Sequence, residues 1–139
     1  MADGFALSLQ KGLRATLAAN SGVTNIVSSR IYDEPPQNAT FPYLRFGEIS
    51  PAAFDTDTIE GSLVAVTFEA HSRSPSGRVE AVQIAEAVKA ALHRKEGSVA
   101  VAGFNLIELI FETISVTRDG EGRGYTAVIV LQAMLEDTA

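Results

Sequence analysis

The fold is decided by residues 62–92, "SLVAVTFEAHSRSPSGRVEAVQIAEAVKAAL", where the spacing of apolar side chains changes from every second residue to that of a helix. The first part predicts a strand with Thr67, Glu69 and His71 on its polar face. Its apolar face consists of Val64, Val66, Phe68 and Ala70. From Gly77 to Arg94 one apolar stripe predicts an amphipathic helix. The stripe consists of Ala81, Ile84, Ala85, Val88, Ala91 and Leu92.

The same two spacings predict the elements on either side. A helix is expected over residues 3–20, where leucines recur at every fourth position and Asn20-Ser21-Gly22 supplies a stop. Residues 50–61, "SPAAFDTDTIEG", are expected to form a polar excursion between strands. The remaining expected elements are a short helical turn before an extended segment at 30–32, a strand at 41–49, and a hairpin of strands at 104–118 and 124–136.

This order indicates one α+β domain over residues 1–139, with a mostly antiparallel sheet of about four strands, two main helices on one face and a long C-terminal β-hairpin. The hairpin strands are apolar on both faces, since Val128, Val130 and Met134 lie opposite the stripe that contains Ile129 and Leu131. Two helices cannot cover both faces of a sheet. We therefore expect the second face to meet another subunit.

The composition excludes several classes of function. The chain has a formal net charge of -6 and no basic stripe, which argues against sequence-specific nucleic-acid binding. It has no cysteine, so thiolate catalysis, disulfides and cysteine metal sites are excluded. No apolar run is long enough for a membrane helix, and Asp3 stands where a secretory signal carries positive charge. A protein made and folded in the cytoplasm is expected.

The turn at residues 72–78, "SRSPSGR", allows two interpretations. A phosphate-binding loop of the Walker type needs several glycines and a lysine, whereas this turn has only Gly77 and no lysine. An isolated anion at the helix start is physically allowed. The simpler interpretation, which we favour, is that Ser76 or Gly77 caps the helix.

The other candidate motifs also favour structural interpretations. "DGEGRG" (residues 119–124) is followed by a strand instead of the helix that a dinucleotide fingerprint requires, so it predicts a hairpin turn. "DTDTIE" (residues 55–60) departs from the calcium-loop pattern and is read as an acidic loop. His71 and His93 lack metal-ligand spacing. No catalytic residue, metal site or cofactor is predicted.

Two phrases in the chain resemble the tail terminator, or tail completion, family of long-tailed bacteriophages and gene transfer agents. The first phrase matches Arg30, Ile31, Tyr32, Pro36, Phe41, Pro42 and Tyr43. The second matches His71, Ser72, Arg73, Gly77, Arg78, Glu80 and Ala81. The resemblance covers nearly the whole chain. One position departs from the pattern, because His71 stands where the family has tryptophan or another aromatic residue.

The resemblance implies a structural virion protein that is not an enzyme and acts without a cofactor. Such proteins form a ring, usually a hexamer, at the head-proximal end of the tail tube, where they end tail polymerisation and meet the head–tail connector. The implied partners are further copies of the chain, the tail tube protein and the connector protein, with DNA passing through the ring without sequence-specific binding and no membrane. The candidate contacts to other subunits or partners are Arg73, Arg78, Asp55, Asp57, Arg118 and Arg123.

Two alternatives remain open at this point. The first is a neck or connector protein on the head side of the same junction. The second is a small phosphate- or nucleotide-binding enzyme that uses the turn at residues 72–78.

Overall fold

The structure is a computed structural model, and it describes residues 4–55, 60–73, 75, 78–119 and 124–137. Within these residues the helices are α1 (Phe5–Ala18), α2 (Ser21–Val27), α3 (Val79–Leu92) and the short 3₁₀ helix η1 (Glu96–Ser98). The strands are β1 (Ile31–Tyr32), β2 (Tyr43–Asp55), β3 (Glu60–Ser72), β4 (Phe104–Arg118) and β5 (Tyr125–Asp137).

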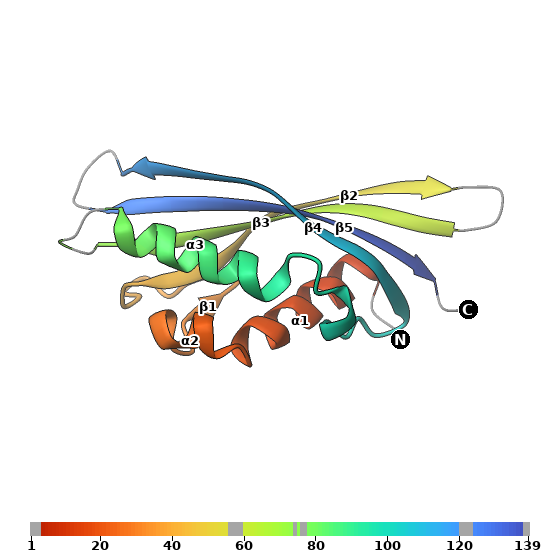
Figure 1. The fold of residues 1–139 in the computed structure, drawn as a ribbon, viewed down its shortest axis with the longest axis horizontal. Helices are drawn as coiled ribbons and strands as arrows, with labels where there is room; N and C mark the ends of the chain where they lie inside the picture. Colours follow the sequence, from red (N-terminus) through yellow and green to blue (C-terminus); the bar gives the residue numbers. More distant parts are fainter. Residues whose placement is uncertain (1–3, 56–59, 74, 76–77, 120–123, 138–139) are drawn as a thin grey trace.

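The described strands form one sheet in the order β1-β2-β3-β5-β4 (Figure 1). β1 runs parallel to β2, and the other neighbouring pairs are antiparallel. The α+β class and the long C-terminal hairpin are confirmed. The expected count of about four strands and two main helices is only roughly matched, because the short helical turn and the extended segment expected between α1 and β2 form α2 and β1.

α2 and β1, which the sequence predicts as a short helical turn and an extended segment, follow from local contacts. α1 ends at Ala18, in agreement with the stop predicted at Asn20. The Asn20 side chain also accepts a hydrogen bond from the Val23 N–H at 3.1 Å and caps the start of α2. The following Ile31 is only 2% exposed and pairs with Leu44 in parallel register. Burial of Ile31 therefore adds β1 to the sheet edge although the strand has only two residues.

The expected polar excursion at residues 50–61 is wrong. β2 continues to Asp55 and β3 begins at Glu60, and these two residues are register partners. The backbone hydrogen bonds of a hairpin depend little on side-chain polarity, so β3 extends the pairing along a polar sequence. Residues 56–59 of the predicted acidic loop lie outside the described residues.

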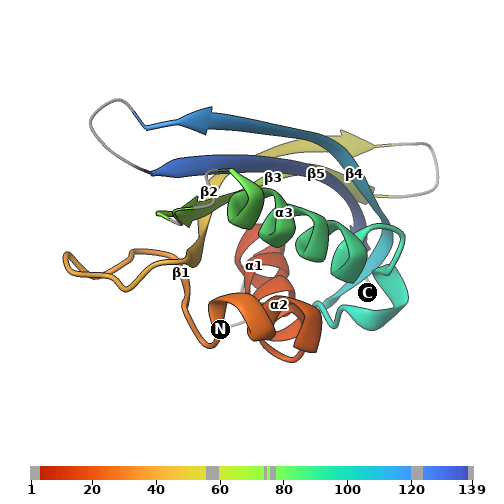
Figure 2. The ribbon, with the colours of Figure 1, turned by 60° about the vertical axis from the view of Figure 1, so that its left-hand side comes forward.

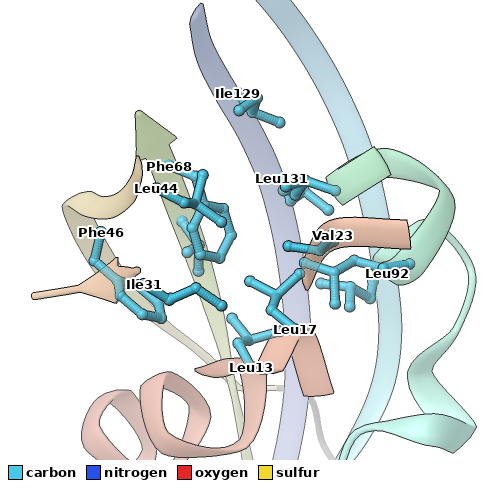
Figure 3. Close-up of a cluster of buried hydrophobic side chains, with 14 of the residues drawn as sticks. Leu13, Leu17, Val23, Ile31, Leu44, Phe46, Phe68, Leu92, Ile129 and Leu131 are labelled. Atoms are coloured by element: carbon cyan, nitrogen blue, oxygen red, sulfur yellow. The ribbon is translucent and has the colours of Figure 1, made fainter. Parts of the chain in front are cut away.

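All three α-helices lie on the same face of the sheet (Figures 1 and 2). Figure 3 shows how side chains from α1, α2, β1 and α3 meet those of the central strands in one core. The predicted apolar faces of α3, β3 and β5 are confirmed, because their members are buried. Burial of this face is the main source of stability, since apolar area removed from water drives folding.

Helix α1 lies close to the segment before β4 at Gly12. A Cβ atom added there would collide with the backbone carbonyl oxygen of Ala100 and would lie 3.3 Å from Cγ1 of Val99. The segment before β4 therefore packs directly on the helix backbone, which only glycine allows. This contact joins the N-terminal helix to the start of the C-terminal hairpin.

We expect Gly12→Ala to lower the free energy of unfolding by up to about 2 kcal/mol. Overpacking costs about 1–3 kcal/mol, and a collision with backbone favours the upper part of that range, whereas the helix-propensity gain is about 1 kcal/mol. Urea unfolding measures the difference. Gly97→Ala is the control, because nothing lies within 4 Å of a Cβ added there. A Gly12→Ala variant that is as stable as the unchanged protein would contradict the close approach.

Candidate functional site

The sheet face opposite the helices is the main candidate site. We call it the open face, because no described helix covers it (Figure 2). Its centre is apolar and half-buried, and the strand register brings its side chains together. The apolar centre consists of Leu63, Ala65, Val128, Val130, Met134 and Ile110. A shallow cavity of about 160 Å³ lies beside Leu63 and Met134, with Glu108 and Gln132 also lining it. An apolar centre with polar margins is the usual anatomy of a protein interface.

A network of polar side chains lies at one end of the open face. His71 Nε2 lies 3.0 Å from Glu69 Oε1, and its Nδ1 lies 3.2 Å from Thr126 Oγ1. The Thr126 hydroxyl donates to Asp119 Oδ1 at 2.8 Å. The order carboxylate, imidazole, hydroxyl also occurs in hydrolases, but there the hydroxyl gives its proton to the imidazole. Here the Thr126 hydroxyl donates its proton to Asp119, so the imidazole does not activate it as a nucleophile. The contact between His71 and Thr126 instead joins β3 to β5.

The same end carries an aromatic cluster built from the residues of the first family phrase. The Tyr43 ring stacks on His71 with centroids 4.9 Å apart and an interplanar angle of 21°. Tyr43 also contacts Tyr32 and Phe41, at 5.7 Å and 5.2 Å between centroids. The imidazole thus occupies the place of an aromatic partner, which explains how histidine fits at a position where the resemblance predicts an aromatic residue.

A polar hollow opens beside this cluster. We call it the arginine hollow; it encloses about 590 Å³. The lining residues are Pro36, Gln37, Asn38, Ala39, Thr40, Phe41, Tyr43 and Arg73. The Arg73 guanidinium lies over the Phe41 ring, 4.4 Å from its centroid. The loop of residues 36–42 is held at its end, because Arg30 Nε donates a hydrogen bond to the Pro42 carbonyl at 2.7 Å.

The predicted contact residues lie at the two ends of the sheet. Arg73, Arg78 and Arg118 lie at the end with the arginine hollow, since Ser72 and Arg118 are both register partners of Tyr125. Arg78 lies over the Tyr125 ring at 5.8 Å. Asp55 ends β2 at the opposite end. Asp57 and Arg123 lie outside the described residues.

The cap predicted for the helix at residues 72–78 has a different position. The N-cap residue of α3 is Arg78, with no side-chain hydrogen bond, while Ser76 and Gly77 lie outside the described residues. Glu80 in the first turn instead accepts a hydrogen bond from Ser72 Oγ at 2.6 Å. A carboxylate at the helix start suits the helix dipole and gives an anionic ligand an unfavourable neighbour.

The other end of α3 protects the free edge of the sheet. His93 Nδ1 accepts a hydrogen bond from the Phe111 N–H at 2.9 Å. The Arg94 N–H donates to the Leu109 carbonyl at 2.8 Å, and the Leu109 N–H donates to Glu96 Oε1 at 3.3 Å. These contacts occupy edge groups of β4 that would otherwise attract another strand. His93 therefore has a structural role in this chain.

Two kinds of site are absent from the part of the chain that the structure describes. No group of three or more His, Cys, Asp or Glu side chains there is arranged to hold a metal ion. No helix among them is long and apolar enough to cross a membrane. Sequence reasoning missed the arginine hollow, although the phrase "FPY" at residues 41–43 marked two of its residues.

Burial raises the pKa of the Tyr43 hydroxyl above its ordinary value of 10.0; Arg45 opposes this shift and Glu69 adds to it. The folded protein therefore favours the protonated hydroxyl. This stabilisation is present below pH 10.0 and is lost as the pH rises through the raised pKa. We expect the melting temperature to fall more in this range for the natural protein than for Tyr43→Phe. Parallel melting curves of the two proteins would contradict this assignment.

The sequence and the fold of this chain both match known proteins. Residues 11–136 match the model of the family "Tail completion protein gp17". A chain in the virion of a native gene transfer agent particle is similar in fold, with a TM-score of 0.86 and 21% sequence identity over 97% of this chain and 99% of that chain. No curated protein matches the chain. Because the family model spans most of the sequence, this chain belongs to the tail completion protein family, a family of structural virion proteins.

Proposed function

We propose that copies of this chain close into a ring, a hexamer, at the head-proximal end of the tail tube, where the ring ends tail polymerisation and joins the tail to the head connector. Membership of the tail completion family supports this role. The observation that carries the proposal is the open face, whose apolar centre has no described helix over it. A monomer in solution would leave this face in water.

The size of the open face indicates how far it can account for a subunit contact. From Leu63 to His71 the face is roughly 30 Å long, at about 3.3 Å per residue. Four strands at about 4.8 Å spacing make it roughly 20 Å wide, or about 600 Å². A stable interface buries about 800 Å² on each partner. The open face is therefore close to one interface, and the ends of the sheet supply the remainder.

The charged residues at those ends are the proposed remaining contacts. Arg73, Arg78 and Arg118 would serve at one end and Asp55 at the other, with Asp57 and Arg123 added from the sequence. Exposed ion pairs contribute little affinity each, but they orient one subunit against the next. The tail tube protein and the connector protein would bind the two rims of the ring.

The net charge of -6 suits a ring through which DNA passes. An acidic bore repels the phosphate backbone, so DNA slides through without binding. Neutralisation of phosphates would instead hold DNA in place, and its strength would depend steeply on salt. The proposal therefore includes DNA as cargo and not as a ligand.

Loss of the protein is expected to give overlong or headless tails, because nothing then ends tube growth. Electron microscopy of particles from a strain that lacks the gene makes the comparison. Light scattering after gel filtration of the purified protein, alone and mixed with tail tubes, is expected to show a ring of several copies. Normal particles from the deletion strain would refute the role. Capture of the connector without the tube protein would assign the chain to the head side.

A charge placed in the apolar centre of the open face is expected to prevent assembly. Val130→Asp would bring an unpaired carboxylate into the contact, which costs several kcal/mol on burial. We expect a folded monomer with nearly unchanged circular dichroism and no ring by light scattering. Gln83→Asp, on the exposed side of α3, is the matched control and should assemble normally. Rings formed by Val130→Asp would show that the open face is not the contact.

A further inference from the structure

The arginine hollow is a second candidate site, at the end of the sheet where β2 begins and β3 ends. It encloses about 590 Å³, which is a usual size for a ligand site. Its lining combines the loop of residues 36–41 with Tyr43 of β2 and with Arg73, which follows β3. Three separate parts of the chain, all of them described by the structure, therefore build the hollow.

Among the described residues that line the hollow, Arg73 is the only cation. Its guanidinium lies over the Phe41 ring, 4.4 Å from the ring centroid. Stacking on an aromatic ring holds the planar guanidinium in place and leaves the N–H groups around its edge for a ligand. Phe41 therefore positions a fork of hydrogen-bond donors at the wall of the hollow.

Two carboxylates at this end of the sheet are engaged with other side chains. Glu69 Oε1 lies 3.0 Å from His71 Nε2, and Asp119 Oδ1 accepts the Thr126 hydroxyl at 2.8 Å. No carboxylate among the described residues forms an ion pair with Arg73. Within the part of the chain that the structure describes, the charge of Arg73 therefore has no direct counterpart.

The chemistry of the hollow favours a carboxylate over a phosphate. A carboxylate accepts two parallel hydrogen bonds from the planar fork of an arginine. DNA is instead held by several cations spread along its backbone. The hollow has one cation among its described residues, and the chain has a net charge of -6 that repels a polyanion. A single carboxylate is therefore the anion that fits the site.

The rest of the lining suits a polypeptide. Gln37 and Asn38 have amide groups that both donate and accept hydrogen bonds, and Thr40 adds a hydroxyl. These groups match the N–H and C=O groups of the backbone on either side of an acidic residue. Pro36 and Phe41 add apolar surface for the methylene groups of that residue. A small free acid would leave most of this lining without a partner.

We propose that the arginine hollow binds an acidic segment of a partner protein, with a glutamate or aspartate carboxylate of that segment on Arg73. Phe41 holds the guanidinium, and Gln37 and Asn38 bind the neighbouring peptide groups. The site goes beyond the proposed ring, because it lies within one chain and needs no second copy.

The binding test uses the full-length chain and a blocked peptide of three glutamates between alanines. The peptide is titrated while the side-chain amide signals of Gln37 and Asn38 are followed by NMR. We expect saturable binding, and at least about fivefold weaker binding to Arg73→Gln. Arg14→Gln, on the exposed side of α1, loses the same charge and should bind like the natural protein. Equal binding to Arg73→Gln and to the natural protein, or no binding, would overturn the proposal.

Two further comparisons test the geometry of the contact. Arg73→Lys keeps the charge but replaces the planar fork by a point charge, so we expect weaker binding than to the natural protein. A peptide in which glutamines replace the glutamates keeps the shape but loses the charge, and it should bind as weakly as the acidic peptide binds to Arg73→Gln. Full affinity in either case would overturn the carboxylate contact.

Free glutarate and a short DNA duplex test other sources of the anion. Each is added to the complex of the natural protein with the peptide, at a concentration equal to that of the peptide. We expect neither to displace it, because glutarate lacks the peptide groups and the duplex needs more cations. Displacement by glutarate would assign the hollow to a small acid, displacement by the duplex would assign it to phosphate, and either would overturn the proposal.

Light scattering keeps this inference separate from the proposed function. If the peptide binds through Arg73 but no ring forms alone or on tail tubes, the site stands and the ring is wrong. If rings form but the peptide does not bind, the ring stands and the site is wrong.

Discussion

The structure depends on one constraint: β5 carries apolar side chains on both faces, and the helices cover only one face of the sheet. α1 and α3 bury the face that contains Phe68 and Leu131, which forms the core of the domain. Val128 and Val130 then lie on the other face, where no described helix lies. A sheet of this kind is stable as a single chain but keeps apolar surface for a partner. The proposed assembly follows from this imbalance.

Much of this arrangement could be predicted from the sequence. The stripe on α3 and the alternation on β3 depend on local spacing, and both were right residue by residue. The extended β2–β3 hairpin was missed because its pairing comes from the partner strand and not from its own side chains. The arginine hollow was missed because Phe41 and Arg73 are far apart in sequence. They meet only through the register that pairs Tyr43 with His71.

The edges of the sheet limit how another copy can bind. The middle of β4 is occupied at its free edge by hydrogen bonds from the segment after α3, through His93, Arg94 and Glu96. The strand also contains register irregularities between Leu106 and Glu108 and between Phe111 and Thr113. Such bulges and occupied edge groups discourage the addition of a further strand. The proposed assembly through the open face and the ends of the sheet would avoid open-ended growth along the edge.

The proposed ring needs a direction that the open face alone lacks. Two identical apolar faces can pair with each other, and such an isologous contact stops at a dimer. A contact between two different surfaces cannot be satisfied in that way, because each copy still has one free surface until a ring closes. The proposed contacts at the two ends of the sheet would set the order of neighbouring copies, since charged groups orient partners more than they bind them. In the proposed ring the apolar centre of the open face would then supply most of the stability.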